Sequence, residues 1–511
     1  MKSFHAPLYE MLVSHATTKP ASFHVPGHHN SESLHLLEKV SEQTKEITDR
    51  FKPIMEIDLT EISATDDLHH PEGAIKDAQS LAAKCFGAED TYFLVGGSTS
   101  GNLALLLTIC TPGDTIIVQR NVHKSVINGL KLAGATAVFL TPQFDKTTGL
   151  ATIPSLDQVE TALMQYPKAT AVFLTNPNYY GISIKLDAYA DSVHRSGIPL
   201  IVDEAHGAHY GFHSKLPQSA LAAGADAVVQ STHKTLPALT MGAMLHVQGD
   251  LIDRGSLVQS LSMIQSSSPS FPIMASLDIA RAMVQTLGSE LFQPVLDAVN
   301  SFNRWVNNEQ LIVRTVNWDE ELEAENIRQL DPLRVLLYDQ TGHLSGYELL
   351  KELEQHGCWA EMADLRYVVL VMGIHMTEVE IGKLRVAITS IHSKYNKSGA
   401  IIVMGTGTEK SSSTEIILKD SSGIGVPVSF ARDHIVKREI ASMQLRQCEG
   451  LQSAEMIVPY PPGIPLVYVG ERLTVDTISQ IESLATAGAK FQGADNTELS
   501  TIKVFIDQKR D

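Results

Sequence analysis

Short, continuously apolar segments alternate with segments of helical length between about residue 70 and residue 250 of this 511-residue chain. The apolar segments that we expect to be strands are 91–95, 115–118, 137–140, 171–174, 198–202, 227–229 and 242–247. Helix candidates such as 125–133 and 156–165 separate most of them. Strands buried on both faces have such apolar sequences, and their alternation with helices is typical of a mostly parallel sheet. The pattern therefore predicts an α/β fold.

Polar or flexible residues directly follow the strand candidates. They are Gly96, Asn121, Asn176, Asp203 and Ser231. In an open α/β sheet, ligands bind in the crevice beyond the carboxyl ends of the strands. We therefore expect one crevice to collect these residues.

Two neighbouring strand candidates end in a specific combination of charged residues. One is followed by Asp203-Glu204-Ala205-His206-Gly207 and the next by Ser231-Thr232-His233-Lys234. Pyridoxal phosphate (PLP) requires a lysine amine for its aldehyde, a carboxylate for its ring nitrogen and polar donors for its phosphate. A lone Asp at a strand end is about as often a helix or turn cap, and a lone Lys is more often a solvated charge. Together, Asp203 and Lys234 favour a PLP site.

A glycine- and hydroxyl-rich segment, 96–102, follows the first strand candidate and opens a helix candidate. Glycines let the backbone approach an anion, and a helix N-terminus presents free amides to it. The hydroxyls of Ser98, Thr99 and Ser100 add further donors. The segment matches neither GxGxxG nor GxxxxGK[ST], which weakens a dinucleotide or P-loop interpretation. A capped turn without a ligand remains the alternative.

A histidine cluster raises the alternative of a metal hydrolase. His206, His209 and His213 lie close together in the sequence, beside two carboxylates. However, Gly207 and Gly211 weaken any helix that would align these histidines, and the HExxH spacing is absent. We therefore expect no metal.

Composition restricts the cellular setting and the partners. The formal net charge of −18 argues against non-specific nucleic-acid binding, which needs Lys and Arg against phosphates. The four cysteines are scattered without a CxxC pair, as in proteins of reducing compartments. The sequence has no apolar signal core at its beginning and no uninterrupted apolar stretch of membrane-spanning length. We expect a cytoplasmic protein that binds neither membranes nor nucleic acids.

The length exceeds that of a typical single core, so more than one domain is expected. The sequence predicts an N-terminal segment at 1–55, a large PLP-binding domain at 56–300 and one or more smaller α+β C-terminal domains at 301–511.

The chain resembles the bacterial Orn/Lys/Arg decarboxylases of PLP fold type I, in the short form without a receiver-like N-terminal domain. The segments that match the family are Phe23-His24-Val25-Pro26-Gly27-His28, Asp66-Asp67-Leu68-His69, Gly97-Ser98-Thr99-Ser100-Gly101-Asn102, Arg120-Asn121-Val122-His123-Lys124-Ser125, Asp203-Glu204-Ala205-His206-Gly207, Ser231-Thr232-His233-Lys234 and Ser266-Ser267-Ser268-Pro269. The proline-rich segment 460–465 also looks like the family's C-terminal domain. The resemblance implies the aspartate-aminotransferase-like fold.

It also implies the residues that face the cofactor. Lys234 would hold PLP and Asp203 would pair with its pyridine nitrogen. His123 would stack on one face of the ring, with Ala205 beneath the other. His206 would lie near the phenolic oxygen and the substrate carboxylate, and Lys234, His206 and His123 would be the catalytic residues.

The phosphate of the cofactor would be held by a second group of residues. The resemblance implies Ser98, Thr99, Ser100, Ser231 and His233 for this group. Ser267 would contribute from a neighbouring subunit, since the family's active sites are shared in a homodimer or a higher assembly. One departure concerns the N-terminal motif, where the family usually has a Lys after Pro-Gly-His and this chain has His29 and Asn30.

The resemblance implies α-decarboxylation of lysine, arginine or ornithine to the corresponding amine and carbon dioxide. The sequence does not distinguish the three substrates, and Glu61, Glu361 and Glu455 are candidates for binding the distal charge. An aminotransferase, or another PLP enzyme of fold type I, is the alternative. Transamination usually uses an arginine to hold the α-carboxylate, for which Arg366 and Arg432 are candidates.

Overall fold

The computed structural model describes residues 4–146, 148–316, 328–396, 423–430, 438–460, 465–486 and 489–506. Its largest element is an eight-stranded sheet with the strand order β1-β8-β7-β6-β4-β2-β3-β14. The strands are β1 (Asp90–Leu94), β2 (Thr115–Gln119), β3 (Thr136–Leu140), β4 (Val172–Thr175), β6 (Leu200–Asp203), β7 (Ala227–Gln230), β8 (Ala243–Val247) and β14 (Val428–Ser429). Every expected strand between residues 90 and 247 is therefore present.

The central pairs of this sheet are parallel: β3 with β2, β2 with β4, β4 with β6, and β6 with β7. Strand β8 runs antiparallel to both β1 and β7, and β14 runs antiparallel to β3. The prediction of a mostly parallel sheet is confirmed. Since β8 opposes both of its neighbours, β1 points the same way as the parallel strands, and its carboxyl end lies at the same edge.

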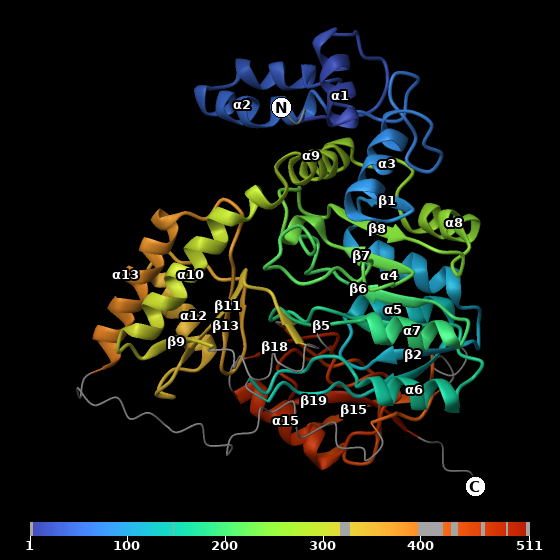
Figure 1. Cartoon of the computed structure of the whole chain (residues 1–511), viewed down its shortest axis with the longest axis vertical. Coiled ribbons are helices and arrows are strands. Elements are labelled where there is room, and N and C mark those ends of the chain that lie inside the picture. Colours follow the sequence, from blue (N-terminus) through green and yellow to red (C-terminus); the bar gives the residue numbers. More distant parts are fainter. Residues whose placement is uncertain are drawn as a thin grey trace.

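Helices cover both faces of the large sheet (Figure 1). Helices α4 (Gly97–Ile109), α5 (Lys124–Ala133) and α8 (Arg254–Ile264) contribute to the core on one face, and α6 (Leu156–Gln165) and α7 (Asp187–Arg195) contribute to the core on the other. Within β2, Ile116 and Val118 belong to the first core and Ile117 to the second. This alternation explains why each strand reads as a continuous apolar run.

Two smaller groups of elements follow in the chain. Strands β12 (Met362–Ala363), β13 (Val368–Val371), β11 (Arg334–Asp339) and β9 (Val313–Thr315) form a four-stranded sheet that packs with α10 (Gln293–Asn308), α12 (Gly346–Gln355) and α13 (Glu378–Tyr395). The last group contains β15 (Glu439–Gln444), β16 (Gln452–Ser453), β17 (Val458–Tyr460), β18 (Lys490–Gln492), β19 (Thr501–Ile506) and α15 (Val475–Thr486). The pair β5 (Ile182–Ile184) and β10 (Arg328–Leu330) joins the large part to the second sheet. The domain boundaries near residues 55 and 300 stay predictions.

The N-terminal helices lie at the top of the view in Figure 1, beside α9. They are α1 (Pro7–Thr17), the 3-10 helix η1 (Glu32–Lys39), α2 (Glu42–Met55) and α3 (Ala74–Phe86), with α9 spanning Phe271–Leu287. Apolar residues of α1, α3 and α9 form one core with β1 and β8. None of the helices in the described ranges is long and apolar enough to cross a membrane.

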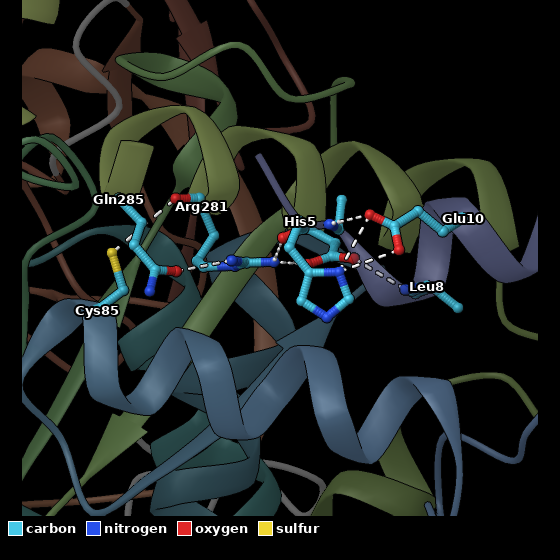
Figure 2. A network of polar contacts seen from close by, with 8 residues as sticks. His5, Leu8, Glu10, Cys85, Arg281 and Gln285 are labelled. Carbon is cyan, nitrogen blue, oxygen red and sulfur yellow. Dashed lines mark hydrogen bonds and ion pairs between the residues drawn. The ribbon is translucent and has the colours of Figure 1, made fainter. Parts of the chain in front are cut away.

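A buried ion pair attaches α1 to α9. Arg281 pairs with Asp278 inside α9, and both side chains are at most 2% exposed. Arg281 also donates to the carbonyl of His5 at 2.8 Å, and Asp278 accepts the amide of Leu8 at 2.9 Å (Figure 2). The pair thereby satisfies backbone groups at the beginning of α1. The side-chain oxygen of Gln285 accepts a further hydrogen bond from the Arg281 guanidinium at 2.8 Å.

A buried polar chain crosses the large sheet from β6 to β1. Glu204 accepts hydrogen bonds from the amide of Ala220 at 2.7 Å and from Gln230 at 2.6 Å. Gln230 in turn contacts His246, whose other ring nitrogen lies 2.8 Å from the hydroxyl of Thr91. Burial raises the pKa of Glu204 to about 8 and lowers the pKa of His246 to about 3. Both groups are therefore neutral in the folded protein at pH 7.

We expect Arg281→Met to destabilise the protein by about 3–5 kcal/mol, because it leaves Asp278 as an uncompensated buried charge. The midpoint of urea unfolding, together with proteolytic cleavage after α1, measures the effect. Arg50→Met is the matched control, since Arg50 pairs with Glu46 at the surface and exposed pairs contribute only about 0–1 kcal/mol. Equal effects of the two substitutions would contradict the anchoring role of Arg281.

We also expect the contribution of Glu204 to stability to fall as pH rises from about 4.5 to about 8, whereas the lowered pKa of His246 acts in the opposite direction below about pH 6.5. In this window the folded protein keeps the proton of Glu204, whereas the unfolded chain has released it, so the folded state binds more protons. The loss amounts to a few kcal/mol, at about 1.4 kcal/mol per unit of pKa difference. Glu204→Gln, a neutral isostere, should flatten this part of the pH profile of urea unfolding. A profile unchanged by the substitution would show that Glu204 is ionised in the folded state.

Candidate active site

Asp203 lies at the carboxyl end of β6, next to the end of β7. Its side chain is buried, with only 3% of the residue exposed. One carboxylate oxygen accepts the amide of Ala205 at 3.1 Å, and the other accepts Nδ2 of Asn102 at 2.9 Å. Asn102 is fully buried in α4. These donors hold the carboxylate in one orientation.

His123 lies at the N-terminal end of α5 and connects to the same asparagine. Asn102 donates to Oγ of Ser125 at 3.0 Å, and Ser125 lies 2.8 Å from Nδ1 of His123. The amide of Ser125 also points at Nδ1, at 3.2 Å. Nδ1 is therefore an acceptor, and the ring proton sits on Nε2. Burial lowers the pKa of His123, although the charge of Asp203 acts in the opposite direction.

Lys234 ends the short 3-10 helix η2 (Thr232–Lys234), which follows β7. Its Nζ lies 3.0 Å from Nε2 of His206 and 5.6 Å from the ring centre of Tyr179. The Tyr179 and His206 rings are 4.5 Å apart. Burial lowers the pKa of Lys234, and Asp203 opposes this shift by its charge. The amine, the carboxylate of Asp203 and the His123 ring thus influence one another electrostatically.

Helix α4 begins at this edge of the sheet with a backbone suited to an anion. Gly97 has a φ of 73°, a conformation that favours glycine. No described side chain caps the helix, and the amide of Gly97 donates to the carbonyl of Met241 at 2.8 Å, so the amides that follow it in the first turn are the ones that could bind a negatively charged group. Ser231 donates to Ser98 at 2.9 Å, which brings the end of β7 to this helix start.

The remaining predicted phosphate ligands differ in their surroundings. The hydroxyl of Ser100 donates to the carbonyl of Gly97 at 2.8 Å, and Thr99 is exposed. Nδ1 of His233 lies 2.9 Å from the carbonyl of Gly242 and donates its proton there. Ser267 is exposed between α8 and α9. The roles of these residues stay predictions.

The residues present fit PLP. A fixed buried carboxylate faces the cluster from β6, an amine of lowered pKa faces it from η2, and uncapped helix amides lie beside Ser98 and Ser231. These are the three kinds of group that the cofactor requires. No metal is needed to explain the cluster.

The other histidines of the sequence cluster have partners of their own. His209 lies 3.1 Å from Asp331, and His213 lies 3.2 Å from Gln293. In the part of the chain that the structure describes, no three His, Cys, Asp or Glu side chains gather as metal ligands. Of the predicted carboxylate-binding arginines, Arg366 lies over the rings of Tyr338 and Tyr367, and Arg432 falls outside the described residues.

Sequence reasoning missed Arg334 and Tyr179 as members of the cluster. Arg334, at the beginning of β11, is only 4% exposed, and its Nη2 lies 3.3 Å from Nδ1 of His206. Arg334 lies far in the sequence from the other site residues, so no motif or spacing linked it to them. Tyr179 follows β4, so the rule that pointed to Asn176 could have found it.

Elements near the end of the chain hold the loop that carries His123. Arg120 forms an ion pair with Glu471, and the hydroxyl of Tyr468 donates to the carbonyl of Arg120. Lys124 donates to Gln492 at 2.8 Å. The loop at the end of β2 is therefore fixed on both sides of His123 by the C-terminal elements.

Curated relatives match nearly the whole chain. A Bacillus subtilis (strain 168) protein, the uncharacterized protein YaaO, is 38% identical over 99% of this chain and 100% of its own length. The arginine decarboxylase of the same organism is 31% identical over 100% of this chain and 99% of its own. Among solved structures, the Francisella novicida lysine decarboxylase LdcF has a TM-score of 0.82 at 19% identity, covering 99% of this chain and 82% of that one. This last likeness confirms the fold.

Two family models account for most of the sequence. The major domain of the Orn/Lys/Arg decarboxylases matches residues 6–380, and their C-terminal domain matches residues 419–499. The matches cover the buried cluster around Asp203 and Lys234 as well as the elements that hold the His123 loop. The chain therefore belongs to the Orn/Lys/Arg decarboxylase family and is an amino-acid decarboxylase.

Proposed function

We propose that this protein uses PLP to decarboxylate a basic amino acid, with arginine as the first candidate. The observation that carries the proposal is the position of Asp203 and Lys234 at the ends of paired strands, facing one buried cluster. Arginine is favoured because relatives named arginine decarboxylase are 29–31% identical over nearly their whole length. The lysine decarboxylase LdcA of Pseudomonas aeruginosa is 24% identical over 76% of its length.

Each residue of the cluster has a task in this proposal. Lys234 binds the cofactor aldehyde, Asp203 holds a proton on the pyridine nitrogen, and the α4 start with Ser98 and Ser231 binds the phosphate. His123 would cover one face of the ring and Ala205 the other. When bound, PLP accepts the electron pair that the departing carboxylate leaves on Cα.

Burial of the cluster suits the loss of carbon dioxide. Asp203, His206 and Arg334 are buried, so little water reaches the reacting carboxylate. A substrate carboxylate loses its hydration there, which favours its release as a neutral molecule. We assign the return of a proton to Cα to Lys234 or His206, whose Nζ and Nε2 lie 3.0 Å apart.

Glu361 is the best candidate for binding the distal charge of the substrate. Its carboxylate raises the pKa of both Lys234 and His233 by its charge, so it acts on the same cluster from the position just before β12. Glu455 accepts the amides of Asp495 and Lys503 within the C-terminal elements. Glu61 accepts the amide of Leu68 in its own loop.

Product analysis with arginine, lysine and ornithine in parallel tests the function. We expect carbon dioxide and agmatine from arginine, at a higher kcat/KM than for the other two amino acids. Lys234→Ala should reduce turnover to background and remove the visible absorbance of bound PLP, because no other amine takes its place. Keto-acid formation with 2-oxoglutarate would contradict the proposal in favour of an aminotransferase.

We expect Glu361→Gln to raise KM for the basic substrate about tenfold, the equivalent of about 1.4 kcal/mol of lost charge pairing. The KM for norleucine, which has no distal charge, should not change. Glu498→Gln, at an exposed position of the C-terminal elements, is the matched control. If Glu361→Gln raises KM for both substrates equally, Glu361 does not bind the distal charge.

A further inference from the structure

Arg334, His206 and Lys234 form a continuous chain of contacts between the second sheet and the candidate active site. Arg334 Nη2 lies 3.3 Å from Nδ1 of His206, and Nε2 of the same ring lies 3.0 Å from Lys234 Nζ. Arg334 and His206 are 4% and 7% exposed, so water does not compete for these contacts.

The chemistry of the three groups fixes the positions of the protons. A guanidinium has only donors, so Nδ1 of His206 must be the acceptor. A neutral imidazole then carries its proton on Nε2, and this nitrogen donates to Lys234. An ammonium group has no lone pair with which to accept, so Nζ must be the uncharged amine.

We propose that Arg334 is a positioning residue that sets the tautomer of His206 and thereby holds Lys234 as an uncharged amine. The uncharged amine is the form that reacts with an aldehyde. Arg334 does not contact Lys234 in this arrangement. It acts through the imidazole of His206 to keep the Lys234 amine in the form that binds the cofactor. The proposal rests on Lys234 being the cofactor-binding residue.

The electrostatics of the cluster agree with this arrangement. Burial lowers the pKa of Lys234, and Arg334 lowers it further. The pKa of His206 is well below its ordinary value because of burial and the charges of Lys234 and Arg334. The charged or titratable groups that act on Lys234 and His206 are Asp203, Arg334, Glu361, His123 and His233.

Local packing explains why Arg334 keeps its position. A Cβ on Gly181 would lie 2.6 Å from the Cβ of Arg334, so only glycine fits opposite the arginine. The amide of Arg334 donates to the carbonyl of Asp331 at 3.0 Å. Within the described residues, Nε of Arg334 has no hydrogen-bond partner, whereas Nη2 contacts His206, and the charge of Arg334 also lowers the pKa of Asp331.

The test measures the pKa of Lys234 in the full-length chain freed of PLP. Limiting acetic anhydride labels uncharged amines, and peptide mass spectrometry follows the labelling of Lys234 across pH. We expect Arg334→Met to raise the apparent pKa of Lys234 by about one unit or more, since it removes both a charge and the donor that orders His206. Arg366→Met, which removes an exposed arginine between β12 and β13, should leave the pKa of Lys234 unchanged. An unchanged pKa in Arg334→Met would overturn the proposal.

A double-mutant cycle separates the route through His206 from a direct effect of charge. In the His206→Ala background, Arg334→Met should shift the pKa of Lys234 by less than half of its effect in the wild type. Equal shifts in both backgrounds would show that Arg334 does not act through the imidazole. The labelling needs no turnover, so loss of decarboxylation alone would refute the proposed function and leave this inference standing. Adding PLP should protect Lys234 from the reagent, which identifies it as the residue measured.

Discussion

The parallel pairing of β6 with β7 is the constraint on which the rest of the structure depends. It brings the carboxyl ends of two strands side by side, so that Asp203 and the turn leading to Lys234 face the same space. Strand β4 pairs with β6 and β2 with β4, which adds Tyr179 and the His123 loop to the same edge. Because hydrogen-bonded strands fix their relative register, the site geometry is a consequence of the sheet.

Burial then determines the charge states at this edge. Without competing water, the guanidinium of Arg334 and the imidazole of His206 control the amine of Lys234 through two contacts. The carboxylate of Asp203 remains fixed by Asn102, which also leads to His123 through Ser125. The imidazoles of His206 and His123 thus both carry their proton on Nε2. Arg334 sets this tautomer for His206, and Ser125 sets it for His123.

Three separate parts of the chain meet around this edge. The large sheet supplies the amine and the carboxylate, the second sheet supplies Arg334 and Glu361, and the C-terminal elements fix the loop of His123 through Arg120 and Lys124. The match to the family's C-terminal domain therefore includes the residues that contact the His123 loop. This arrangement gives a physical reason for the C-terminal elements in a protein whose proposed cofactor residues all lie before residue 270.

The sequence by itself determined where the strands lie along the chain and the α/β class, because buried parallel strands have continuous apolar sequences. It also determined which residues follow each strand, and ligands bind at these strand ends. It also determined the family, through ordered motifs such as the segments around Asp203 and Lys234. Only the tertiary structure decided that Arg334 joins the cluster, that the charge of Glu361 acts on Lys234 and His233, and that the C-terminal elements hold the His123 loop. These contacts join residues of different sheets, and no local periodicity or spacing records which distant surfaces pack together.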